Sequence, residues 1–237
     1  LLGIPLTEVD TLSLSLGLDK NDITTVDGST PTSLINNLVA ELGDRERSTF
    51  ACNGPDTDTD GTGPDTDTDT TTGICTGPFR QWTINTWSLQ AGWQRDSRNK
   101  YFAPTRGTYQ RIGAEVALPG SDLEYYKVAY EFGRYFPLWG EYALLTKAEL
   151  GYGDGYGNTS TLPFYQNFYG GGVRSVRGFE DNTLGPTETA STASSYRQPL
   201  GGAFKTVGGL ELIIPTPMTK GDSDTAQLSA FVDVGNV

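Results

Sequence analysis

The residues with the clearest capacity for polar chemistry lie in the stretch FYGGGVRSVRGFEDN, residues 168–182. Two arginines, Arg174 and Arg177, stand there among glycines and aromatic residues, in a chain whose net charge is −12. A buried guanidinium must be paired, because an isolated charge in a confined interior is strongly disfavoured. Gly178 permits a backbone conformation that a side chain would obstruct. We therefore expect Arg177 to bind carboxylates from elsewhere in the chain. We expect Arg174 to be solvated, with a place in the same network as the alternative.

The chain offers little for catalysis. It has 237 residues and no histidine, which removes the usual general base and the commonest metal ligand. Paired carboxylates could serve glycoside chemistry, but no cleft-like arrangement of them is evident. The acidic balance argues against nucleic-acid binding, because neutralising phosphates requires clustered Lys and Arg. We predict a protein that is not an enzyme and that needs no cofactor.

An acidic repeat, GPDTDTDGTGPDTDTD, is the second candidate for polar chemistry. Asp56, Asp58 and Asp60 match the opening of a calcium loop, D-x-D-x-D-G. The twelfth position holds Asp67 instead of the expected bidentate Glu, and no helices directly flank the loop. We interpret the repeat as a solvated insertion, with a calcium site as the alternative.

The two cysteines of the chain, Cys52 and Cys75, bracket this repeat. One pair around a low-complexity polar loop is typical of a disulfide in an oxidising compartment. Two unpaired thiols are the alternative, although an exposed free thiol is reactive. We predict a disulfide between Cys52 and Cys75.

Alternation of apolar and polar residues recurs along the chain and predicts an all-β fold. Leu12, Leu14, Leu16 and Leu18 fall on one face of the first such segment. Seven segments alternate in this way, and each is about as long as the ~9–11 residues of a tilted transmembrane strand. They are TLSLSLGLD, TINTWSLQAGWQRDS, GTYQRIGAEVAL, EYYKVAYEFGRYF, EYALLTKAELGYG, AFKTVGGLELIIP and AQLSAFVDVGNV.

The connections between these segments alternate between short and long, with the long ones at 23–79 and 153–202. In an antiparallel meander this places tight turns at one rim and large loops at the other, which is typical of an outer-membrane β-barrel. A soluble β-sandwich is the alternative, but its connections are seldom so long. Within 23–79 the stretch TPTSLINNLVAELGD predicts a short amphipathic helix at 33–42, with Thr32 or Ser33 as N-cap.

Seven strands cannot close a bacterial barrel, in which the strand number is even and at least ~8. An open sheet would leave two unpaired edges in lipid. We therefore expect an antiparallel sheet that is part of a larger barrel. Within it, the alternation places small and charged residues on a polar lumen face, among them Lys147, Glu149, Glu115, Glu211 and Asp233. Glu211 and Asp233 are the predicted partners of Arg177.

The block PFYQNFYGGGVRSVRGFEDNTLGP, with VRGF at Val176–Phe179, resembles the sixth-loop segment of the BamA family of outer-membrane protein assembly factors. The resemblance covers nearly all of 1–237, because further matches follow in the family's order: DSRNKYFAPTRG, LPGSDLEYYKV, GYGDGYG, LELIIPTPM and FVDVGNV. It implies that 1–237 is part of the C-terminal barrel domain, with 23–79 as an extracellular loop and 153–202 as a loop that enters the lumen.

The resemblance also implies a site and a function. Val176, Arg177, Gly178 and Phe179 would anchor the loop in the lumen, with Arg177 held by Glu211 and Asp233. The protein would fold and insert β-barrel proteins into the bacterial outer membrane, with unfolded outer-membrane proteins as substrates and with accessory lipoproteins and outer-membrane lipid as partners. A TamA-like or two-partner secretion transporter of the same superfamily is one alternative. A passive porin or adhesin is another.

Overall fold

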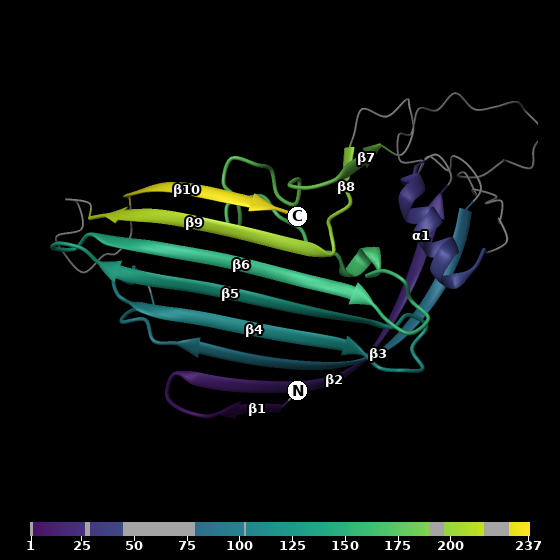
Figure 1. The fold of residues 1–237 in the computed structure, drawn as a ribbon, viewed down its shortest axis with the longest axis horizontal. Helices are drawn as coiled ribbons and strands as arrows, with labels where there is room; N and C mark the ends of the chain where they lie inside the picture. The colour runs from purple at the N-terminus through teal and green to yellow at the C-terminus, as the bar shows by residue number, and fades with distance from the viewer. Residues whose placement is uncertain (1, 27–28, 45–78, 102, 190–196, 216–227) are drawn as a thin grey trace, which may run out of the picture.

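The computed structural model describes residues 2–26, 29–44, 79–101, 103–189, 197–215 and 228–237. In these residues one curved antiparallel sheet has eight strands in the order β1-β2-β3-β4-β5-β6-β9-β10 (Figure 1). The all-β prediction is confirmed. The strands are β1 (Leu2–Pro5), β2 (Asp10–Val26), β3 (Phe79–Asp96), β4 (Gly107–Ala117), β5 (Tyr125–Pro137), β6 (Ala143–Gly155), β9 (Phe204–Ile214) and β10 (Leu228–Asn236).

Cross-strand register gives the sheet two chemically different faces. The leucines at 12, 14, 16 and 18 of β2 lie opposite Trp93, Ala91, Leu89 and Trp87 of β3, and this outer face is apolar and exposed. The inner face carries Glu115, Lys147, Glu149, Glu211 and Asp233, as the alternation predicted. An exposed apolar face opposite a polar one is typical of a barrel wall between lipid and a lumen. Among the described residues, no helix is both long and apolar enough to cross a membrane.

The sheet has one strand more than the seven predicted. The additional strand, β1, pairs with β2 from Leu2 opposite Leu14 to Pro5 opposite Thr11. Its sequence, LGIP, is short and ends in a proline that cannot donate a hydrogen bond, so it carries no strand pattern of its own.

The long connections are shorter than predicted because the strands beside them extend further. Since β2 runs to Val26 and β6 to Gly155, the connections span 27–78 and 156–203. The second one contains a 3₁₀ turn, η1 (Phe164–Gln166), and a small hairpin of β7 (Thr187–Thr189) and β8 (Arg197–Pro199), neither of which was predicted.

The helix predicted at 33–42 is present as α1 (Thr32–Leu42), but the predicted cap is wrong. Pro31 occupies the N-cap position without a side-chain hydrogen bond, and the backbone amide and hydroxyl of Ser33 donate to Glu188 instead. Gly43 ends the helix at a φ of 81°, and its N–H donates to the carbonyl of Val39.

Helix α1 lies beside the ends of β2 and β3 that extend past the rest of the sheet (Figure 1). Its Leu38 is almost fully buried against Trp82, Ile84 and Leu123. Phe164 from the 156–203 connection packs against the same cluster. The amphipathic face of the helix is therefore buried between the sheet and the second long connection.

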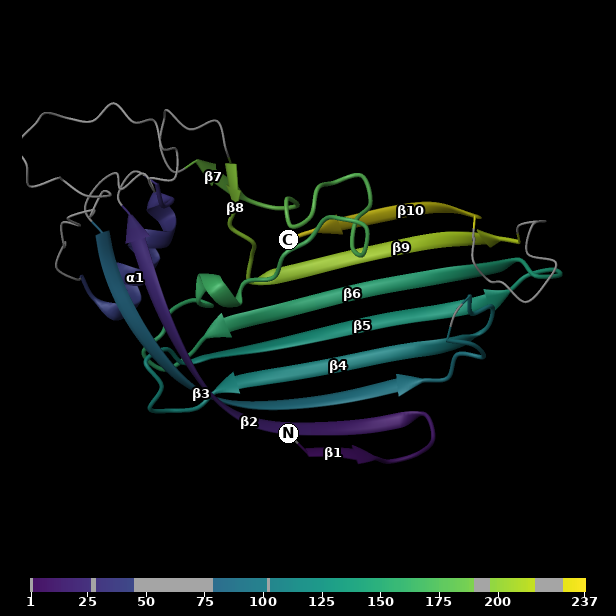
Figure 2. The same cartoon turned by 180° about the vertical axis from the view of Figure 1, so that it is seen from behind.

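The part of the 156–203 connection between η1 and β7 lies beside β6, β9 and β10 in both views (Figure 2). Glycines of β6 leave room for it: a Cβ on Gly151 would lie 2.7 Å from Cε1 of Phe168, and one on Gly153 would lie 3.0 Å from Cδ2 of Leu162. Leu162 is buried with Ala117 and Tyr125 on the inner face. This part of the connection thus lines the inner wall of the sheet.

Two predictions concern residues outside the described ranges. Cys52 and Cys75, the predicted disulfide, lie there, and so do Asp56, Asp58 and Asp60 of the alternative calcium site. Both stay predictions.

Candidate loop anchor on the inner face

A tight turn within the 156–203 connection presents Arg177 to the wall. The N–H of Gly172 donates to the carbonyl of Phe179 over 3.1 Å, and that of Ser175 donates to the carbonyl of Gly172 over 3.2 Å. Gly178 has a φ of 98°, which L side chains rarely adopt. A Cβ there would meet no atom within 4 Å. Glycine is therefore required at 178 by the backbone conformation. A side chain there would strain the backbone, but it would not collide with a neighbouring atom.

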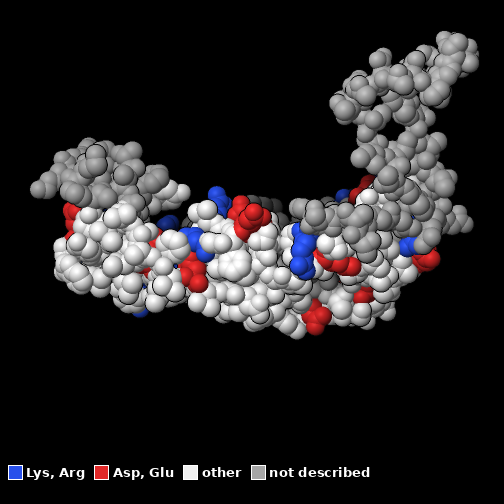
Figure 3. Space-filling model, turned by 90° about the horizontal axis from the view of Figure 1, so that it is seen from above, with Lys and Arg blue, Asp and Glu red and all other residues white. Residues whose placement is uncertain are grey.

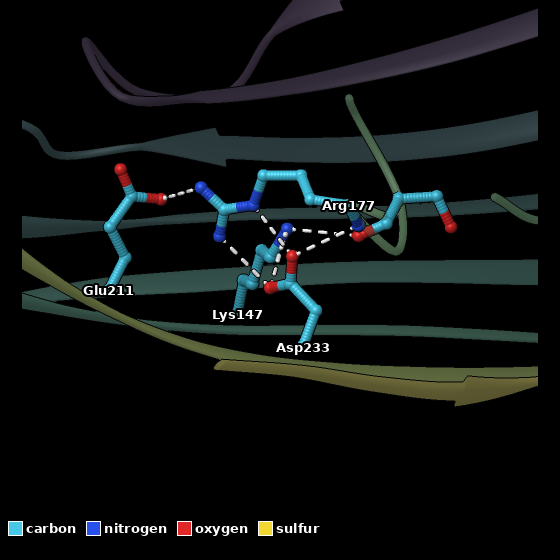
Figure 4. Close-up of polar contacts among 5 residues, drawn as sticks. Lys147, Arg177, Glu211 and Asp233 are labelled. Carbon is cyan, nitrogen blue, oxygen red and sulfur yellow. Dashed lines mark hydrogen bonds and ion pairs between the residues drawn. The ribbon is translucent and has the colours of Figure 1, made fainter. Parts of the chain in front are cut away.

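The guanidinium of Arg177 lies between carboxylates from two neighbouring strands (Figure 4). Its Nε and Nη2 donate to the Oδ2 and Oδ1 atoms of Asp233 on β10, over 2.6 and 2.9 Å. Its Nη1 donates to Oε2 of Glu211 on β9 over 2.7 Å. The backbone N–H of Arg177 donates to Asp233 as well, over 3.2 Å. The predicted contacts of Arg177 with both carboxylates are confirmed, and the one with Asp233 is bidentate.

Lys147 of β6 is a fourth member of the cluster, which the sequence did not reveal. Its Nζ lies 3.3 Å from Oδ1 of Asp233 and donates to the carbonyl of Ser175 over 3.1 Å (Figure 4). Register explains the contact: Lys147 lies opposite Gly209 of β9, which in turn lies opposite Asp233. A Cβ on Gly209 would lie 2.4 Å from Cε of Lys147 and 2.6 Å from Oδ1 of Asp233. The missing side chain at Gly209 lets the two charges meet across β9.

The charges of the cluster balance, with two cations and two carboxylates. Asp233 is the most enclosed, with 1% of its side chain exposed, against 15% for Arg177 and 20% for Glu211. The hydrogen bonds to Asp233, followed by those to Glu211, raise the pKa of Arg177 above its usual value, so the guanidinium is always charged. Seen from above, acidic and basic side chains are interspersed along the molecule (Figure 3). The cluster of Lys147, Arg177, Glu211 and Asp233, called the anchor below, has no net charge.

Apolar contacts complete the site. The Cζ atom of Arg177 lies 3.5 Å from the centroid of the Phe231 ring, a cation–π contact. Val176 is buried, and a Cβ on Gly235 of β10 would lie 2.8 Å from its Cγ2 atom. Phe179, by contrast, is 52% exposed and contributes its backbone carbonyl to the turn. Of the VRGF residues, Val176 and Arg177 face the wall, Gly178 shapes the turn and Phe179 points away from it.

The alternation of residues along each strand was sufficient to predict the two carboxylates. It could not identify residues whose place in the site depends on the register between strands. Lys147 was assigned to the inner face, but nothing in a single sequence aligned it with Asp233. Gly209 and Gly235 carried no signal either, because strand glycines recur throughout the chain. Arg174 is exposed, as expected. Since every charge in the cluster has a partner, the arrangement is suited to holding a segment in place.

Comparison with known proteins identifies the family. A model of the Omp85 superfamily domain matches residues 1–237. The chain is 39% identical over 163 residues to the outer membrane protein assembly factor BamA of Neisseria meningitidis, a match that covers 68% of this chain and 19% of that protein. It is 30% identical over 146 residues to the mouse sorting and assembly machinery component 50 homolog, covering 60% of this chain and 29% of that protein. The chain therefore spans less than a third of either relative.

A solved structure carries the same fold. The BamA of Haemophilus ducreyi lacking POTRA domains 1–3 matches with a TM-score of 0.74 over 99% of this chain and 40% of that one, at 24% identity. The predicted resemblance to the BamA family and the prediction of a partial barrel are confirmed. Membership of this family also supports the prediction that the chain is not an enzyme. The chain is part of an integral β-barrel of the bacterial outer membrane. Because the family's domain matches every residue of the chain, the chain belongs to the Omp85 superfamily.

Proposed function

We propose that the chain is the middle part of the C-terminal barrel of an outer-membrane insertase, which folds and inserts β-barrel proteins. Its substrates would be unfolded outer-membrane proteins, and its partners accessory lipoproteins and outer-membrane lipid. In this proposal the 23–79 region is an extracellular loop and the 153–202 region is a loop held in the lumen. The observation that carries the proposal is the cluster of Arg177, Glu211 and Asp233, in a chain similar to a protein named as an assembly factor.

We propose that the anchor keeps the 156–203 connection and three strands together as one unit. Arg177 binds β9 and β10 through Glu211 and Asp233, and Lys147 adds β6 through Asp233 and the loop carbonyl of Ser175. Removing one partner from an enclosed ion pair costs about 3–5 kcal/mol, since it leaves an uncompensated charge. An insertase must deform its wall to admit a substrate strand. A unit of this strength would confine that deformation to other strands.

The test uses the full-length protein in its host, with the wild-type copy under depletion. Arg177→Ala should impair the folding of unrelated barrel proteins, measured by their heat-modifiable migration on gels. Arg174→Ala removes the same charge three residues away, from an exposed side chain, and should support normal folding. Arg177→Lys keeps the charge but loses the bidentate contact, so it should be intermediate.

Two outcomes would contradict the proposal. If depletion of the whole protein leaves unrelated barrel proteins folded, the insertase function is wrong. Steady channel conductance without any effect on other proteins would then favour a passive porin. If depletion impairs folding but Arg177→Ala rescues it fully, the function stands and the anchor has no part in it.

A further inference from the structure

A row of three polar residues crosses the outer face of the sheet near the 138–142 turn. Thr108 of β4, Arg134 of β5 and Thr146 of β6 lie opposite one another across the three strands. Phe132 and Phe136 precede and follow Arg134 on the same face of β5. A guanidinium flanked by two hydroxyls therefore lies on the side of the wall that faces lipid.

Arg134 has no acidic partner among the residues that the structure describes. Its side chain is exposed, and its Cζ atom lies 4.7 Å from the centroid of the Phe136 ring. Another outward-facing arginine, Arg95 on β3, differs in this respect, because its Nη1 lies 3.8 Å from Oδ1 of Asp10. The wall thus supplies a carboxylate for one outer-face arginine and only an aromatic ring and hydroxyls for the other.

The side chain of Arg134 is directed toward the short-turn rim. Phe136, over which the guanidinium lies, is two residues closer to the 138–142 turn than Arg134 is. In that turn Trp139 is 66% exposed, and its ring lies 5.3 Å from that of Tyr142. Trp and Tyr mark the level of the lipid headgroups. Arg134 therefore starts within the apolar band and extends its charge toward the interface, as long cationic side chains near strand ends do.

An arginine on the lipid side is costly at the bilayer midplane and nearly free of cost at the interface. What it meets at the interface is the phosphate of a phospholipid, whose oxygens fit the guanidinium fork. The hydroxyls of Thr108 and Thr146 lie on either side of Arg134 and can donate to the remaining phosphate oxygens. For Thr146 this requires its hydroxyl to turn from the carbonyl of Arg134, to which it donates over a long 3.5 Å.

We propose that Thr108, Arg134 and Thr146 form a binding site for the phosphodiester of a phospholipid in the leaflet at the short-turn rim. The phosphate lies on the guanidinium, and the acyl chains follow the apolar outer face of β5 and β6. The proposal rests on the barrel spanning the membrane and does not depend on the insertase function. The site would fix the height of this part of the wall in the bilayer.

The test is a titration of the detergent-purified full-length protein with phosphatidylglycerol, read by native mass spectrometry. Arg134→Gln should weaken the tightest lipid-binding event about tenfold or more, as expected for the loss of charge-assisted hydrogen bonds. Arg111→Gln is the matched control, because Arg111 lies on the inner face of the neighbouring strand β4 and its loss changes the net charge equally. It should bind lipid as the wild type does. A phosphate-free galactolipid should not compete for the site, and inorganic phosphate should compete only weakly.

The proposal is overturned if Arg134→Gln binds phosphatidylglycerol as the wild type does, or if Arg111→Gln loses as much affinity as Arg134→Gln. Equal binding of the galactolipid would also overturn it, because the phosphate would then play no part. Should Arg134→Gln fail to fold, the double variant Thr108→Val, Thr146→Val keeps the outer face apolar and retains the arginine. That variant should weaken lipid binding several-fold, and unchanged binding would count against the site.

Discussion

The two carboxylates that hold Arg177 should contribute very unequally to stability. Asp233 accepts hydrogen bonds from Nε, Nη2 and the backbone N–H of Arg177, and it also lies 3.3 Å from Nζ of Lys147. Glu211 accepts one hydrogen bond from Arg177 and is 20% exposed, against 1% for Asp233. Asp233→Asn therefore leaves Lys147 without a carboxylate and Arg177 with a single one, whereas Glu211→Gln breaks one partly solvated contact.

The magnitudes follow from these contacts. Breaking an enclosed pair costs about 3–5 kcal/mol, and we expect Asp233→Asn to fall in that range. A single hydrogen bond to a charged group is worth about 1.5–3 kcal/mol, and the exposure of Glu211 places its loss at or below the lower end. The difference between the two variants should therefore be at least about 1.5 kcal/mol.

The assay is urea unfolding of the refolded full-length protein in detergent, followed by heat-modifiable migration and by the near-ultraviolet signal of its tryptophans. Adding Lys147→Met to Asp233→Asn removes the unpaired cation, so the double variant should be less destabilised than the sum of the two single variants. Equal losses for Asp233→Asn and Glu211→Gln, or strict additivity in the double variant, would refute the reasoning.

Three further predictions concern the surroundings of the anchor. Gly209→Ala should destabilise the barrel by about 1–3 kcal/mol, as overpacking does, because its Cβ would clash with Lys147. The same urea assay measures the effect. Gly113→Ala is the control, because a Cβ at Gly113 meets no atom within 4 Å. Glu41→Gln should make the 156–163 segment more sensitive to protease, because Glu41 accepts hydrogen bonds from the amide and hydroxyl of Ser160; unchanged cleavage would count against the contact. Burial raises the pKa of Tyr165 from 10.0 to about 12. The stabilisation that the neutral tyrosine provides is therefore fully present below pH 10 and should be lost as the pH rises toward 12. Tyr165→Phe should remove this decrease from the pH profile of the unfolding free energy, and an unaltered profile would contradict the raised pKa.

The sequence could predict the strands because each one faces two different solvents. Lipid on one side and a polar lumen on the other force strict alternation, and the leucines at 12, 14, 16 and 18 display it without tertiary information. β1 was not predicted because it has four residues and ends at Pro5, which is too short for an alternating pattern to be recognised. The N-cap of α1 was misassigned because Ser33 binds Glu188, a residue far away in the sequence.

The anchor was half predictable for a similar physical reason. Parity along a strand fixes which face a residue occupies, and that was sufficient to choose Glu211 and Asp233. Register between strands is set by the whole sheet, and it alone aligns Lys147, Gly209 and Asp233 in one row. A one-residue shift of β9 would turn both Gly209 and Glu211 to the lipid side and break the contact with Arg177. The contacts of the anchor therefore depend on the observed register of β9.

The 156–203 connection is held near its start and near its middle by polar contacts of different kinds. Near its start, Glu41 and Asn37 of α1 bind Ser160 and Thr161 through contacts between exposed groups, which water can replace at little cost. Near its middle, the Arg177 cluster is enclosed, and water cannot replace its contacts in the same way. If the connection moves during an insertion cycle, the polar contacts of Ser160 and Thr161 with α1 should therefore break before those of Arg177 with β9 and β10. The buried contacts of Leu162 and Phe164 must be lost as well before this first part can leave the wall, whereas the turn at Arg177 can stay in place throughout.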